Sequence, residues 1–176
     1  MKLDIKTLNS KKFGLFESQN QLGTLTYNSS FTKDNGTIEV NNATISMFKN
    51  KGFLSSEIQI IRDNQIVFSI VQKFSGTLEI RSESNNKKYW LKSKNFWQGT
   101  KVLLDENQRE LLVELKKYNW KNWSYDYSFE TTNDFELLSE KELLLFCLFQ
   151  GEQKIQANTI AAMIPIFIVI ISATNH

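Results

Sequence analysis

The residues that could bind a ligand form a short cluster of lysines and aromatic rings. Within eight positions the chain carries three lysines and three large rings, which are Lys116, Lys117, Tyr118, Trp120, Lys121 and Trp123. Tyrosine and tryptophan rings favour the membrane–water interface, and lysines are attracted to anionic lipid. The same mixture suits single-stranded nucleic acid, because the rings can stack on bases. The cluster therefore predicts a lipid or ligand surface.

A second group of similar composition lies upstream and contains Lys87, Lys88, Trp90, Lys92, Lys94 and Trp97. Both groups also have a structural interpretation, in which the rings plug the ends of a barrel while the lysines solvate turns and protect edge strands. The formal net charge of only +2 argues against a protein whose task is to neutralise a nucleic-acid backbone. Nucleic acid is therefore not the expected partner.

Residues for catalysis are scarce. The one histidine is His176, so neither a Ser-His pair nor a His-containing zinc site is expected. Cys147 lies within an apolar run, where a thiol is buried and inert. Glu140 and Glu142 are explained by helix capping and by the helix dipole. We expect a non-enzymatic protein with no metal and no cofactor, and an enzyme of unknown type is the third alternative.

Most of the chain is expected to form strands, and these strands position the residues described above. Short alternating segments separated by Gly-Thr pairs and polar turns continue to about residue 129. About ten to twelve such strands at regular spacing predict an antiparallel barrel or sandwich. One expected hairpin pairs residues 101–104 with residues 109–116 across a turn at 105–108, with Leu111, Val113 and Leu115 on one face.

An apolar helix is expected after the strands. Ser139 and Glu142 have the spacing of a capping box, and a helix over residues 139–150 would end at Gly151. Residues 143–149 leave no polar face, so either protein or lipid must enclose this helix, and the lumen of a barrel is one place that would do so. The fold class predicted is mainly β (α+β), an antiparallel barrel of about ten to twelve strands around an apolar C-terminal helix.

This layout resembles the tubby C-terminal-like superfamily, which includes the phospholipid scramblases and the LURP-one-related proteins. The segments that carry the resemblance are residues 90–97, the aromatic turn at 120–123 with Tyr125 and Tyr127 after it, and the helix start at 142–149. It implies a closed barrel through which the final helix is threaded. Tubby proteins bind phosphoinositide headgroups through basic residues, but none of those residues can be matched here, and the calcium segment of the scramblases is not recognisable.

A second apolar run at residues 160–171 has no place in that plan. As a helix it would span about 18 Å, against roughly 30 Å of bilayer hydrocarbon. Three interpretations stay open: a membrane anchor, a buried helix and a buried strand. Pro165 is tolerated in membrane helices, whereas the β-branched residues around it favour a strand.

The sequence thus predicts two parts, a barrel with its enclosed helix over residues 1–156 and an apolar segment over residues 157–176. Without an apolar segment near Met1 or a second cysteine, a cytoplasmic location is expected, with membrane association through the apolar segment. The expected function is binding or membrane association, through contact with anionic lipid. The alternative is a soluble structural or interaction protein whose residues 160–171 lie in its own core.

Overall fold

Twelve strands and two helices make up the part of the chain that the structure describes. The computed structural model describes residues 1–30, 33, 35–40, 44–50, 57–73, 75–95, 99–119 and 124–156. The strands are β1 (Lys2–Thr7), β2 (Lys12–Glu17), β3 (Asn20–Tyr27), β4 (Asn35–Val40), β5 (Thr44–Asn50), β6 (Glu57–Arg62), β7 (Gln65–Gln72), β8 (Leu78–Ser82), β9 (Lys87–Asn95), β10 (Thr100–Leu104), β11 (Glu110–Asn119) and β12 (Ser124–Thr131). A short helix α1 (Asn133–Glu136) follows, and then a helix over residues 141–156, called here the barrel helix.

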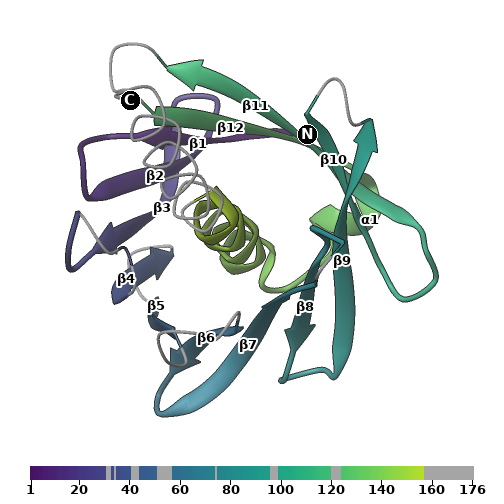
Figure 1. Ribbon diagram of the computed structural model, residues 1–176, viewed down its shortest axis with the longest axis horizontal. Coiled ribbons are helices and arrows are strands. Elements are labelled where there is room, and N and C mark those ends of the chain that lie inside the picture. Colours follow the sequence, from purple (N-terminus) through teal and green to yellow (C-terminus); the bar gives the residue numbers. More distant parts are fainter. Residues whose placement is uncertain are drawn as a thin grey trace, which may run out of the picture.

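The strands form one antiparallel sheet that closes on itself. Each strand pairs with its neighbours in sequence, and β1 pairs with both β2 and β12 (Figure 1). The closing register places Leu3 opposite Phe129 and Ile5 opposite Tyr127, all four of them buried. Closure leaves no free sheet edge at this position. The prediction of a mainly β, antiparallel architecture is confirmed.

Several turns follow directly from local sequence. Asp63 and Asn64 connect β6 and β7 with φ angles of 51° and 63°, which Asn and Asp tolerate better than most residues. The turn between β10 and β11 is held by the Asp105 carboxylate, which accepts hydrogen bonds from the backbone N–H groups of Asn107 and Arg109 at 2.9 and 2.8 Å. The predicted hairpin between residues 101–104 and 109–116 is confirmed.

The barrel helix lies inside the ring of strands (Figure 1). Residues 143–149 are each exposed by 4% or less. The Phe149 ring contacts Phe13 of β2 and Tyr127 of β12, with ring centroids 4.9 and 5.0 Å apart. The next turns of the helix meet other strands, because Gly151 lies against Leu78 of β8. Strand side chains therefore cover the apolar helix from different sides of the ring.

The predicted helix bounds of 139–150 are wrong at both ends. The helix begins at residue 141, after a turn that contains Ser139, and it continues to residue 156, at the edge of the described range. Gly151 does not end the helix, although glycine often does so. A Cβ atom at this position would lie 2.6 Å from Leu78 Cδ1, so glycine allows the helix to approach β8 closely.

The prediction that Leu111, Val113 and Leu115 lie on one face of β11 is also wrong. Leu115 is 38% exposed, whereas Leu112 and Glu114 are fully buried. The cause is a β-bulge opposite β10, where the register shifts from Leu103–Leu112 to Leu104–Glu110. An extra residue in one strand reverses the alternation beyond it. The positions after the bulge therefore point inward at 112, 114 and 116.

The two ends of the barrel carry different features. At one end, called the α1 end, lie helix α1, the turn at 105–108 and residue 141 of the barrel helix. At the opposite end, called the exit end, lie the last residue of β11, the first residue of β12 and residue 156. No helix within the described residues is both long and apolar enough to cross a bilayer. The run at 160–171 lies outside the described residues.

Candidate functional site

The predicted lipid or ligand surface is divided by the sheet. Lys116 and Lys117 are successive residues of β11, so their side chains point to opposite faces. Lys116 points inward and forms an ion pair with Glu152 of the barrel helix. Lys117 points outward, is exposed, and has no partner among the described residues. Of the two, only Lys117 is available at the surface.

The one aromatic member that the structure describes, Tyr118, lies at the exit end. The Tyr118 ring packs edge-on against Tyr125 of β12, with centroids 5.1 Å apart, and Tyr125 is 40% exposed. These two rings share the inward face of their strands with Lys116 and Tyr127, which are paired in register. The other three predicted residues, Trp120, Lys121 and Trp123, lie outside the described residues. The three described members are thus separated: Lys116 points into the barrel, Lys117 points outward, and Tyr118 packs against Tyr125, which was not among the predicted residues.

A buried charge cluster lies just inside the exit end. The Glu152 side chain is inaccessible to solvent and accepts from the ammonium groups of Lys101 on β10 and Lys116 on β11. Both lysine side chains are mostly buried, with 16% and 20% exposed. Burying ions is costly unless they are paired, so these contacts fix the position of the helix against two strands.

Glu114 belongs to the same cluster, but among the described residues its carboxyl group has no hydrogen-bond partner. Its side chain is completely buried, and both carboxyl oxygens are unsatisfied among the described residues. Burial, and then the negative charge of Glu152, raises the pKa of Glu114 to about 8. Lys101 lies opposite it in register, but the Lys101 ammonium binds Glu152 instead. Glu114 is therefore protonated and neutral at pH 7.

Neutral polar groups extend this network around the end of the helix. The Tyr27 hydroxyl donates to Gln150 at 2.7 Å, and Gln156 donates to the Tyr127 hydroxyl at 2.8 Å. The Lys33 ammonium donates to Gln153 at 3.1 Å, and burial lowers the pKa of Lys33. Sequence reasoning missed this network. The signal in the sequence was the change from apolar residues to Gln150, Glu152, Gln153 and Gln156 after residue 149.

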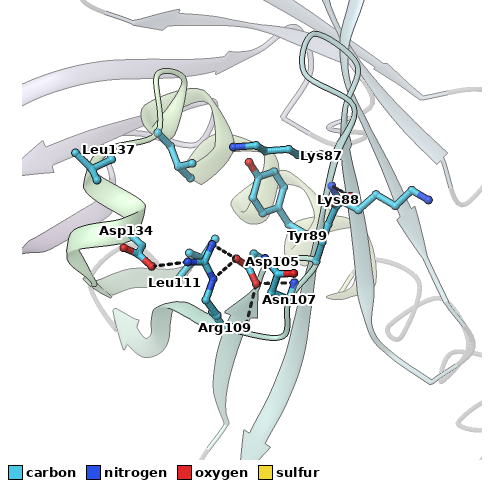
Figure 2. Close-up of a pocket in the computed structure, with 11 residues that line it drawn as sticks. Lys87, Lys88, Tyr89, Asp105, Asn107, Arg109, Leu111, Asp134 and Leu137 are labelled. Carbon is cyan, nitrogen blue, oxygen red and sulfur yellow. Dashed lines mark hydrogen bonds and ion pairs between the residues drawn. The ribbon is translucent and has the colours of Figure 1, made fainter.

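The α1 end holds a pocket of about 280 Å³ (Figure 2). It lies between the start of β9, the turn at 105–108 and the chain after α1, and its lining includes Lys87, Tyr89 and Leu137. On one side the Arg109 guanidinium joins Asp105, at 2.7 Å, to Asp134, at 3.2 Å. Partial burial raises the pKa of Asp105, but hydrogen bonds from Arg109 outweigh this and lower it overall. This side of the pocket is therefore held by an ion-pair network.

Two members of the upstream lysine–aromatic group, Lys87 and Lys88, line this pocket. The Lys87 side chain and the Tyr89 hydroxyl lie toward the cavity, whereas the Lys88 side chain extends away from it (Figure 2). Lys92 and Lys94 lie further along β9 and donate to Gln108 and Glu110. Trp97 lies outside the described residues. The upstream group thus contributes one inward cation to a defined pocket.

The described residues contain no cluster of three or more His, Cys, Asp or Glu side chains that could hold a metal ion. Cys147 is fully buried in the barrel helix, and burial raises its pKa well above the ordinary value. A thiol in that state is a poor nucleophile. His176 lies outside the described residues.

Comparison with known proteins gives no match: no family model, curated protein or solved structure is similar to this chain.

Proposed function

We propose that this protein is a non-enzymatic binding module that contacts anionic lipid at the exit end of its barrel. The observation that carries the proposal is the filled lumen. The barrel helix occupies the space in which open barrels hold small ligands, and its residues 143–149 are buried. A ligand would therefore contact the two ends or the outer face of the barrel.

The exit end has the chemistry for a lipid surface. Lys117 supplies an outward ammonium group without a partner among the described residues, and Leu115 on the same outer face is 38% exposed. Cations beside exposed apolar groups favour the interface of an anionic membrane. Gln156 also lies at this end, so the sequence that leads to the apolar run 160–171 starts here.

The proposed relation to the tubby C-terminal-like superfamily rests on the element order alone. Twelve antiparallel strands followed by an apolar helix support it, as does the position of that helix among strand side chains. The proposed lipid contact does not depend on this relation, because it is inferred from Lys117 and Leu115 of this chain and not from any residue of that superfamily.

Co-sedimentation with phosphatidylcholine vesicles, with and without phosphatidylserine, tests the proposal. We expect Lys117→Glu to weaken binding to the phosphatidylserine vesicles severalfold, since one favourable cation near an anionic surface contributes about 1 kcal/mol. The matched control is Lys2→Glu, which makes the same charge change at an exposed site near the α1 end. Equal binding by both variants and the unmodified chain would reject this surface. Lys116 is unsuitable for charge reversal, because a carboxylate at this position would face Glu152 in the core.

Deletion of residues 157–176 separates membrane anchoring from the alternative. If the apolar run inserts into lipid, the full chain pellets with membranes and the shortened chain does not. If the run instead completes a protein core, the full chain stays in the supernatant and the shortened chain has a lower free energy of unfolding. The second result would favour an interaction protein without a membrane anchor.

A further inference from the structure

Two adjoining cavities at the α1 end share one set of residues. The larger has a volume of about 280 Å³ and the smaller about 140 Å³. Lys87, Tyr89, Leu137 and Leu138 line both of them. Together the cavities offer space for a compact organic molecule, at the opposite end of the barrel from Lys117.

The pocket presents hydrogen-bond donors that lack acceptors. Lys87 and Tyr89 alternate along β9, so both side chains point to the same face. Neither the Lys87 ammonium nor the Tyr89 hydroxyl has a partner among the described residues. Tyr89 is 4% exposed, and burial, followed by the charge of Glu106, raises its pKa. Its hydroxyl therefore remains protonated and can donate to an anion.

Three of the carboxylates around the two cavities are engaged in ion pairs. Asp105 and Asp134 both accept from Arg109, at 2.7 and 3.2 Å. Glu140, at the smaller cavity, accepts from Arg62 at 2.6 Å. Arg109 keeps N–H groups that these ion pairs do not use, because its guanidinium has five. Glu106 also lines the larger cavity, and among the described residues its carboxylate accepts from the backbone N–H of Lys88 at 3.1 Å but forms no ion pair. The cation that points into the pocket without an ion-pair partner among the described residues is the Lys87 ammonium.

One wall of the pocket is apolar and open to solvent. Leu137 is 84% exposed, the highest value among the large hydrophobic residues that the structure describes. The buried side chain of Leu111 lines the same cavity, and Leu137 lies at its rim, in the chain after α1 (Figure 2). An apolar group placed here would remove Leu137 from water, which is favourable.

From these contacts we propose that the α1-end pocket binds a small organic anion, with its carboxylate or phosphate on Lys87 and Tyr89 and its apolar group on Leu137. A free metabolite and the end of a lipid could both supply this chemistry. The chemistry excludes a simple inorganic ion as the preferred ligand, because such an ion makes no use of the leucine wall.

Isothermal titration with phenyl phosphate and with inorganic phosphate tests the site. We expect phenyl phosphate to bind more tightly than inorganic phosphate. Lys87→Gln should weaken phenyl phosphate binding by about tenfold or more, and Tyr89→Phe by about threefold to tenfold, the range expected for charged and neutral hydrogen bonds. Leu137→Ser should remove the preference for phenyl phosphate and leave phosphate binding unchanged.

The matched control is Lys94→Gln, which makes the same change further along β9, outside the pocket. It should bind phenyl phosphate like the unmodified chain. Equal losses in Lys87→Gln and Lys94→Gln would overturn the proposal, as would a lack of phenyl phosphate binding or a preference for benzylamine. Circular dichroism of each variant checks that the fold is retained.

Vesicles that contain phosphatidic acid identify the source of the anion. Vesicle binding that Lys87→Gln abolishes and Lys117→Glu leaves intact would assign the pocket to a lipid headgroup. Phenyl phosphate binding without any effect of Lys87→Gln on vesicles would assign it to a free molecule. Because Lys117 and Lys87 lie at opposite ends, the lipid surface and the pocket can fail independently.

Discussion

Replacement of Glu114 by glutamine tests whether the barrel holds a neutral carboxylic acid in its core. Burial keeps the proton on Glu114 to about pH 8, whereas in the unfolded chain the group ionises near its ordinary pKa of 4.5. Between these values the folded state binds a proton that the unfolded state has lost. The contribution of Glu114 to stability is therefore fully present below pH 4.5 and falls as the pH rises toward 8.

The magnitude follows from that interval. At about 1.4 kcal/mol per pH unit, the interval from 4.5 to about 8 corresponds to at most about 5 kcal/mol of unfolding free energy. Glu114→Gln cannot ionise, so it should lose none of this stability as the pH rises. The glutamine side chain would bury an extra N–H group without a partner, which lowers the free energy of unfolding of the variant by about 1–3 kcal/mol. We expect the variant to be less stable than the unmodified chain at pH 5 and more stable at pH 9.

Urea unfolding followed by tryptophan fluorescence at pH 5, 7 and 9 measures these differences. Glu79→Gln is the matched control, because Glu79 is also buried but binds Lys73 at 3.0 Å and Arg81 at 2.7 Å. Burial raises the pKa of Glu79, but these two cations lower it overall, so Glu79→Gln should be destabilising at pH 7 and less so in acid. If Glu114→Gln and the unmodified chain lose the same free energy of unfolding between pH 5 and 9, the pKa of Glu114 is not raised in the folded state.

Two further predictions concern packing and the pocket wall. Gly23→Ala should destabilise the barrel by about 2 kcal/mol in urea unfolding. The added Cβ would lie 2.6 Å from the Glu39 carbonyl oxygen and 3.1 Å from the Phe146 ring. A change below about 0.5 kcal/mol would contradict the packing described. Asp105→Asn should cost about 1 kcal/mol at pH 7 through its weakened bonds to Arg109. Hydrogen bonds lower the pKa of Asp105 in spite of burial, so that cost should disappear as the pH falls through the pKa of Asp105 in the folded state. A cost that stays constant with pH would refute this prediction.

Local patterns were sufficient to predict the class of the fold. Alternating segments up to about residue 129 predicted strands, and β12 has that form, with Tyr127 and Phe129 buried and Tyr125 partly exposed. The hairpin around 105–108 was predicted from the same local signals. Turn residues and period-two alternation act over a few positions, so a single sequence displays them.

The candidate site depended on contacts that no local pattern contains. Lys116 and Lys117 looked like one basic patch, yet the sheet places them on opposite faces. Alternation alone gave the wrong face for β11, because the bulge at Leu103 and Leu104 shifts the register by one residue. The bulge arises from pairing between two strands, and neither strand shows it by itself.

The sequence by itself determined that residues 143–149 had to be enclosed, because an apolar segment without a polar face cannot lie against water. Only the tertiary structure decided which residues meet this helix beyond its apolar part. There Glu152 binds two lysines from neighbouring strands, and Glu114 remains neutral beside them. Burial and the distance between charges set that arrangement, and both exist only once strands far apart in the chain surround the helix.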